Sequence, residues 1–176
     1  RLGQSKVIYE ALDTLINNST EPLDETQKRI IETELLSMKH RGVGLKNVEK
    51  DLFNSASERL AELSTAFSNN ILDSTKEWSL LLTKASEVSG LPQRTLEVLA
   101  NAAKEAGDRH PENNKEPSIE QGPWRLGLDM PRYLPFITYS TNRSLREVIY
   151  KAYVTRASIG KFDNTTLIEE ILTLRK

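Results

Sequence analysis

The chain has 176 residues, of which 38% are hydrophobic and 28% charged, so it can form one domain with a modest core. Its net charge is −1, and a chain without an excess of basic residues has no electrostatic reason to bind nucleic acid or an anionic membrane surface. It contains no cysteine, which excludes a disulfide framework and a thiolate zinc site. It also has no apolar run as long as a membrane helix, so we expect it to be soluble.

Apolar residues at helical spacing predict three helices in the first part of the chain. The first covers residues 5–17. The second starts near Asp24, where Gln27 completes a capping-box pattern, and it stops at the glycines of residues 42–44. The third covers about residues 46–73 and would be about 40 Å long, at about 1.5 Å per residue. Its apolar stripe consists of Val48, Leu52, Ala56, Leu60, Leu63, Phe67 and Ile71.

Two short segments alternate between apolar and polar residues, which is the pattern of half-buried strands. They are residues 77–83 and 123–129, and we expect them to pair as a ribbon because each strand alone would leave backbone groups unpaired. A helix that begins at Pro92 and ends at Gly107 lies between them. The polar stretch 107–121 has few apolar anchors, and it is predicted to be a mobile loop.

The last third begins with residues 130–137, to which the pattern assigns no regular element. A helix over about residues 142–157 and a final helix from about Asn164 follow. The predicted fold class is mostly α: a helical bundle around one long helix, with a minimal two-stranded β ribbon, in a single domain over residues 1–176.

The helix over residues 142–157 has the widest apolar face, so the core is predicted to form between it and the long helix. Phe67 on the long helix is expected to be buried against Leu145 and Ile149. Asn69 lies off the apolar stripe and is expected to be exposed.

The chain offers few residues for catalysis. Its two histidines, His40 and His110, are far apart in the sequence and are interpreted as surface residues. No His-Glu-x-x-His pattern occurs, and a catalytic zinc needs three protein ligands that usually include histidine. The sequence has no glycine-rich phosphate loop after a strand and no serine at a strained strand-to-helix turn. It therefore assigns no catalytic residue, no metal ligand and no cofactor to this chain.

One basic and aromatic segment is a candidate for binding. Residues 142–161 contain several arginines and lysines with a single acid, Glu147, and tyrosines lie nearby. Such a cluster can hold the carboxylates and aromatic groups of a peptide. The alternative, a solvated basic face with tyrosines between core and water, is the more usual use of these residues. The possible peptide-contacting residues are Arg146, Tyr150 and Arg156.

Three sets of residues, in order along the chain, form a recognisable pattern. The first is the long-helix run 60–75, the second is the segment 122–135, and the third comprises residues 145–147, 150–158 and 163–164. Together they resemble the oligopeptidase A and thimet oligopeptidase family of zinc metalloendopeptidases, of plant or bacterial type. Residues 17–50 and 107–121 match this family least.

The resemblance implies the N-terminal, non-catalytic portion of an enzyme that degrades short peptides. In that family a helical region faces a catalytic region across a deep channel, and the zinc-binding histidines lie beyond this segment. The resemblance thus implies that the chain is one wall of a channel too narrow for folded proteins. The implied partners are the catalytic domain of the same polypeptide and short peptides. Zinc is expected only in the parent's catalytic domain, and this chain alone is predicted to be inactive.

A stand-alone truncated homologue, which binds peptides or a partner protein without cutting, is the alternative function. The chain opens with Arg1 instead of methionine, which favours a piece of a longer protein, and the reading frame after Lys176 separates the two hypotheses. The resemblance implies an intracellular parent, in the cytoplasm, or in a chloroplast or mitochondrion if it comes from a plant. Neither nucleic acid nor a membrane is an expected partner.

Overall fold

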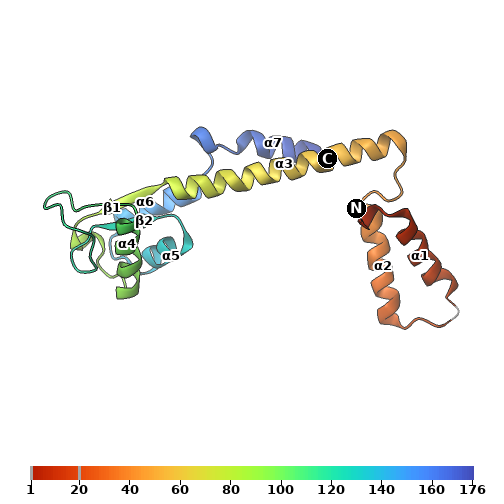
Figure 1. Ribbon diagram of the computed structural model, residues 1–176, viewed down its shortest axis with the longest axis horizontal. Coiled ribbons are helices and arrows are strands. Elements are labelled where there is room, and N and C mark those ends of the chain that lie inside the picture. Colours follow the sequence, from red (N-terminus) through yellow and green to blue (C-terminus); the bar gives the residue numbers. More distant parts are fainter. Residues whose placement is uncertain (1, 20) are drawn as a thin grey trace. The chain divides into compact units, whose positions relative to one another are not determined.

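The computed structural model describes residues 2–19 and 21–176 (Figure 1). In these ranges the fold is mostly α, with seven α-helices and one two-stranded antiparallel sheet, which confirms the predicted fold class. Contacts group the chain into two compact units, Arg1–Ala61 and Glu62–Lys176. The described helices include none with the length and apolar character needed to cross a membrane.

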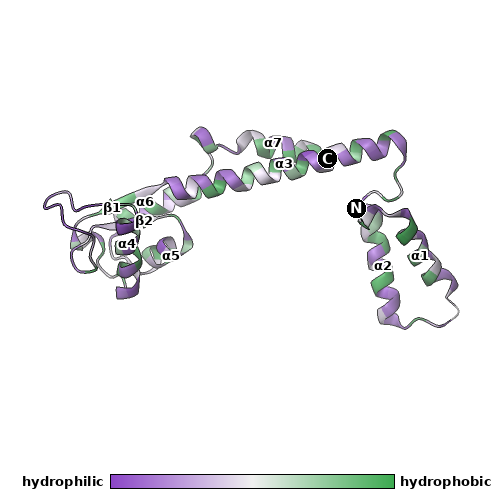
Figure 2. Cartoon of the chain, in the orientation of Figure 1, coloured by the Kyte–Doolittle hydropathy of each residue, from purple (hydrophilic) through white to green (hydrophobic). Residues whose placement is uncertain are grey.

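The first unit contains a helical hairpin. The 3-10 helix η1 (Leu2–Gln4) leads into α1 (Lys6–Asn18), which packs on α2 (Glu25–His40). The predicted capping box is present, because the Asp24 carboxylate accepts from the Gln27 amide at 2.7 Å and the Gln27 side chain accepts from the Asp24 amide at 3.0 Å. Figure 2 shows hydrophobic and hydrophilic stretches alternating along these helices, as in amphipathic helices.

Helix α3 (Asn47–Glu77) is the predicted long helix and continues past its expected end at residue 73. Its apolar stripe is covered unevenly. Leu63 is buried at 2% exposure, whereas Val48 and Leu52 are 69% and 66% exposed. The amphipathic pattern therefore predicted the helix correctly, although the N-terminal part of the stripe is exposed in the described chain.

Phe67 is only half-buried and lies outside the core, so its predicted burial against Leu145 and Ile149 is wrong. The physical reason is that Ile149 packs with the residues of the ribbon and of the helices around it, which leaves α3 at the margin of the core. Asn69 is exposed, as predicted.

The core of the second unit is built on the ribbon. Strand β1 (Ser79–Leu82) pairs antiparallel with β2 (Trp124–Gly127), which confirms the predicted pairing. Helices α4 (Gln93–Glu105) and α5 (Met130–Tyr139) pack on β2 and on each other, and α6 (Arg143–Val154) packs on α5. Figure 1 shows these elements gathered at the C-terminal end of α3. The most deeply buried large side chains here are Leu82, Leu99, Trp124, Leu126, Leu128, Phe136 and Ile149.

Helix α5 is the element that the sequence pattern did not predict. Pro131 lies in its first turn, where the missing amide hydrogen is harmless, but Pro135 lies inside the helix and removes a backbone hydrogen bond. The same helix buries Tyr133 and Phe136, at 8% and 0% exposure. The free energy gained by burying these two aromatic side chains offsets the free energy cost of the internal proline.

The final helix, α7 (Thr165–Leu174), starts against α3. Asn164, at 2% exposure, donates from its side-chain amide to the Phe67 carbonyl oxygen at 3.2 Å and accepts from the Asn70 side chain at 2.8 Å. The 3-10 helix η3 (Gly160–Phe162) precedes it. The Asn164 side chain thus ties the start of α7 to the backbone of α3.

Polar contacts hold the two ends of the loop 107–121. Near its start, the ring Nε2 of His110 lies 3.2 Å from the Thr83 carbonyl oxygen. Near its end, Ser118 and Gly122 exchange two backbone hydrogen bonds of 2.9 and 3.0 Å. Residues 111–116 between these contacts are exposed. Mobility of the loop stays a prediction, and because of these contacts we expect it only in the middle of the loop.

Candidate functional site

Tyr133, Tyr153 and Arg156 form a stack where α5 meets α6. The two tyrosine rings are nearly parallel, with centroids 4.0 Å apart and planes 15° apart. The Arg156 guanidinium carbon lies 3.8 Å from the centroid of the Tyr153 ring, and Nη1 donates to the Tyr153 carbonyl oxygen at 2.5 Å. A guanidinium that stacks on a ring and bonds to the backbone is fixed in direction. The stack therefore presents a positioned cation.

The environment of the stack keeps Tyr133 neutral. Burial raises the pKa of the Tyr133 phenol, Tyr153 and Tyr150 raise it further, and the positive charge of Arg156 acts in the opposite direction. The Tyr153 hydroxyl lies 3.8 Å from the sulfur of Met130. These surroundings suit packing and recognition more than proton transfer at neutral pH.

Arg156 also lines an open pocket of about 540 Å³ in the second unit. The end of α3, the start of β1, the C-terminal part of α6 and η3 form its walls. Its lining combines apolar side chains, among them Trp78, Leu128 and Phe162, with charged ones. The Glu77 carboxylate in the lining is paired with the Lys161 ammonium at 2.5 Å.

The structure gives the three predicted peptide-contacting residues different surroundings. Arg156 lies in the pocket, and Tyr150 is 54% exposed on α6. Arg146 donates Nη1 to the Ser140 carbonyl oxygen at 2.8 Å, at the C-terminal end of α5, so it has a structural partner. Peptide contact stays a prediction for all three, and the pocket gives Arg156 the strongest physical basis.

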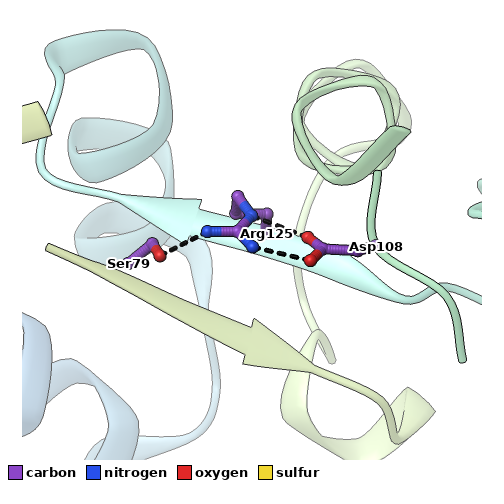
Figure 3. Close-up of polar contacts among 3 residues, drawn as sticks. All are labelled: Ser79, Asp108 and Arg125. Atoms are coloured by element: carbon purple, nitrogen blue, oxygen red, sulfur yellow. Dashed lines mark hydrogen bonds and ion pairs between the residues drawn. The ribbon is translucent and has the colours of Figure 1, made fainter. Parts of the chain in front are cut away.

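A second polar cluster, which the sequence analysis missed, joins the ribbon to the loop after α4 (Figure 3). Arg125 on β2 donates Nε and Nη2 to the two carboxylate oxygens of Asp108, both at 2.6 Å, and Nη1 to the Ser79 hydroxyl on β1 at 2.5 Å. The hydrogen bonds that the Arg125 guanidinium donates to Asp108 raise its pKa. With its donors engaged by protein groups, Arg125 has a structural role. Strand alternation indicated a polar residue at this position, but no local signal pairs it with Asp108.

Sequence similarity to known proteins covers nearly the whole chain. Residues 1–50 match the family model described as "Neurolysin/Thimet oligopeptidase, N-terminal domain". Over 99% of its length the chain is 39% identical to "Organellar oligopeptidase A, chloroplastic/mitochondrial" and 38% identical to "Probable cytosolic oligopeptidase A", both of Arabidopsis thaliana. It is 36% identical to the oligopeptidase A of Escherichia coli, again over 99% of the chain. The chain belongs to the oligopeptidase A and thimet oligopeptidase family.

This match confirms the family inferred from the three motifs. The chain spans about a quarter of the length of the curated oligopeptidase A relatives, with 22% of the organellar, 24% of the cytosolic and 25% of the bacterial protein. Residues 17–50 resembled the family least by motif, yet all of them fall within the matched N-terminal domain.

The zinc that membership of the oligopeptidase family implies does not fit the residues described here. Both ring nitrogens of His110 engage backbone groups, because Nε2 lies 3.2 Å from the Thr83 carbonyl oxygen and Nδ1 accepts from the Glu112 amide at 3.3 Å. His40 lies in the other unit, at the end of α2. In residues 2–19 and 21–176 no group of three histidine, cysteine, aspartate or glutamate residues comes together as a metal site.

Proposed function

We propose that this chain is the non-catalytic N-terminal helical part of an oligopeptidase A-type zinc metallopeptidase that degrades short peptides, and that it forms one wall of the substrate channel. One observation carries the proposal: 99% of the chain aligns at 36–39% identity with proteins named oligopeptidase A, of whose length it spans about a quarter. The partner is the catalytic domain of the same polypeptide, which supplies the zinc and the catalytic residues.

Exposed apolar side chains support a large partner. Val48 and Leu52 on α3 are more than half exposed, and Ile168 and Leu172 on α7 are 44% and 57% exposed. Apolar residues at helical spacing on an exposed face mark surfaces that another protein segment covers. A catalytic domain in the same polypeptide is a suitable cover.

A chimera tests the proposal. Residues 1–176 replace the aligned segment of the Escherichia coli oligopeptidase A, and cleavage of a quenched fluorescent short peptide and of a stably folded protein is measured. We expect the chimera to cleave the peptide and to leave the folded protein intact. A folded chimera that cleaves both substrates contradicts the channel-wall role, and a folded chimera that cleaves neither contradicts the family function.

The alternative is a stand-alone peptide- or protein-binding module. Sequencing the transcript beyond Lys176 distinguishes this module from the N-terminal part of a peptidase. A frame that continues into a His-Glu-x-x-His motif supports the peptidase, and an immediate stop codon supports the module.

We propose an intracellular location, in the cytosol or in an organelle. The names of the two plant relatives read "cytosolic" and "chloroplastic/mitochondrial". Imaging of the full-length product fused to a fluorescent protein distinguishes these compartments, and export from the cell would contradict the proposal.

A further inference from the structure

The pocket beside Arg156 combines one positioned cation with an apolar lining. Arg156, Trp78 and Phe162 all line it, and its volume of about 540 Å³ lies within the range of roughly 300–1,000 Å³ that is usual for small-ligand sites. The Glu77 carboxylate in the lining is held by Lys161 at 2.5 Å. Lys161 lies outside the lining but neutralises Glu77, so Arg156 is the lining charge without a counter-ion in this pair, which favours an anionic ligand.

The geometry of Arg156 favours a planar anion. Stacking at 3.8 Å on the Tyr153 ring uses the face of the guanidinium and leaves the N–H groups at its edge as donors. The structure shows one of them engaged in the described chain, by the Tyr153 carbonyl oxygen at 2.5 Å. A guanidinium fork matches a carboxylate, to which it can donate two parallel hydrogen bonds. Because the stack already fixes the side chain, binding costs little additional side-chain entropy.

We propose that this pocket binds the C-terminal carboxylate of a short peptide whose last side chain is apolar. Arg156 donates to the carboxylate, and Trp78 and Phe162 contact the last side chain. The inference rests on the proposed function, because short peptides are the molecules that a channel wall would meet. It adds that the chain distinguishes a free peptide end from an internal segment by its charge.

The two tryptophans of the chain make the test specific. Trp78 lines the pocket, whereas Trp124 is 2% exposed and donates its indole N–H to the Ile119 carbonyl oxygen at 3.2 Å. Their indole N–H signals can be followed separately by NMR in the ¹⁵N-labelled chain. The probes are Ala-Ala-Leu with a free carboxylate and the same peptide with a C-terminal amide.

We expect the free acid to shift the Trp78 signal in a saturable way while the Trp124 signal stays in place. The amide should bind at least about tenfold more weakly, because it loses the charge-assisted hydrogen bonds. In Arg156→Gln the difference between acid and amide should disappear. Arg143→Gln is the matched control, since Arg143 is an exposed arginine at the start of α6, the helix that Arg156 follows, and it should keep the difference.

Several outcomes overturn the inference: no shift of Trp78 with either peptide, equal affinity for the acid and the amide, or an unchanged preference in Arg156→Gln. The comparison of acid with amide uses the unmodified chain, so it decides even if Arg156→Gln fails to fold. The chimera tests the proposed function through cleavage. If the chimera cleaves peptides but the Trp78 signal does not shift, only the carboxylate site is rejected. If the chimera is inactive but the Trp78 signal shifts, only the channel-wall role is rejected.

Discussion

At Arg125, three segments that are distant in the sequence meet through one guanidinium. Asp108 follows α4, Ser79 begins β1, and Arg125 lies in β2. The Asp108 side chain is 13% exposed and that of Arg125 is 28% exposed, so water screens the pair only partly. Such a bidentate pair contributes more than an exposed one, because burial has already removed part of the solvation of both groups and the loss of one partner leaves the other charge uncompensated.

Asp108→Ala is expected to lower the free energy of unfolding by about 1.5–3 kcal/mol, the usual range for hydrogen bonds to charged groups. Two of the hydrogen bonds of the Arg125 guanidinium are lost, and a partly buried cation is left without its anion. Urea denaturation followed by tryptophan fluorescence measures the change. Glu147→Ala removes the exposed ion pair with Lys151 and is the control, for which we expect no measurable shift of the midpoint. Equal effects in the two variants would mean that the Arg125–Asp108 pair contributes no more to stability than an exposed ion pair.

Tyr133 gives the second unit a dependence on alkaline pH. Burial raises the pKa of its phenol above the ordinary value of about 10, so the folded state binds this proton more tightly than the unfolded state. The contribution to stability is fully present below about pH 10 and is lost as the pH rises through the raised pKa.

Tyr133→Phe should reduce the loss of stability between pH 9 and pH 11, both values chosen to bracket the ordinary pKa of about 10. Urea midpoints of the wild-type chain and of the variant at the two pH values measure it. Tyr139, at 54% exposure, supplies the control Tyr139→Phe. An identical alkaline loss in wild type and Tyr133→Phe would show that this phenol is not responsible.

At the scale of the element, α3 shows that a long amphipathic helix need not be the centre of a core. Leu63 is its deeply buried side chain, while Phe67, one turn later, is half-buried. Leu63→Ala is therefore expected to cost about 2–5 kcal/mol and Phe67→Ala less than that. Asn69→Ala, at an exposed position, should stay within about 0.5 kcal/mol. Denaturant midpoints rank the three variants. A larger loss of stability in Phe67→Ala than in Leu63→Ala would contradict the deeper burial of Leu63.

The loop 107–121 should be the first site of limited proteolysis, and Lys115 is the expected position of the first tryptic cut. Residues 111–116 are exposed between the contacts at its ends, whereas α3 is protected by its regular helical hydrogen bonds. The two pieces should stay together on gel filtration, because β1 lies before the cut and β2 after it. An early cut in α3, or pieces that separate under native conditions, would disprove this account.

Local signals explain which elements the sequence could predict. The capping box at Asp24 and the glycine stop after α2 were readable because their partners lie within a few residues. Helix α5 could not be predicted, because Pro135 disfavours a helix. The burial of Phe136, which offsets this effect, is seen only in the structure.

The same distinction applies to the candidate site. Charge clustering pointed to Arg156, but the pocket and the stack beside it join residues from α3, β1, α5 and α6. The pairing of Arg125 with Asp108 depends on the path of a loop, which no periodic pattern specifies.

At the scale of the whole molecule, the chain of residues 1–176 alone should neither bind zinc tightly nor cleave peptides. Its two histidines lie in different units, and the sequence has no cysteine to supply a thiolate ligand. The purified chain is incubated with a quenched fluorescent peptide, with and without added zinc, and zinc binding is measured by calorimetry. Cleavage that a chelator abolishes, and that copurifies with this polypeptide, would contradict the expectation. The chimera is the positive control.

The ribbon closes a long loop of chain, since residues 83–123 lie between its two strands. The conformational entropy lost in closing such a loop grows only with the logarithm of its length, and each doubling costs about 0.6 kcal/mol. Extra sequence placed among the exposed residues 111–116 would therefore hardly weaken the pairing of β1 with β2. This stretch is a natural insertion point, where a reporter domain or an affinity tag can be added with little cost to the fold.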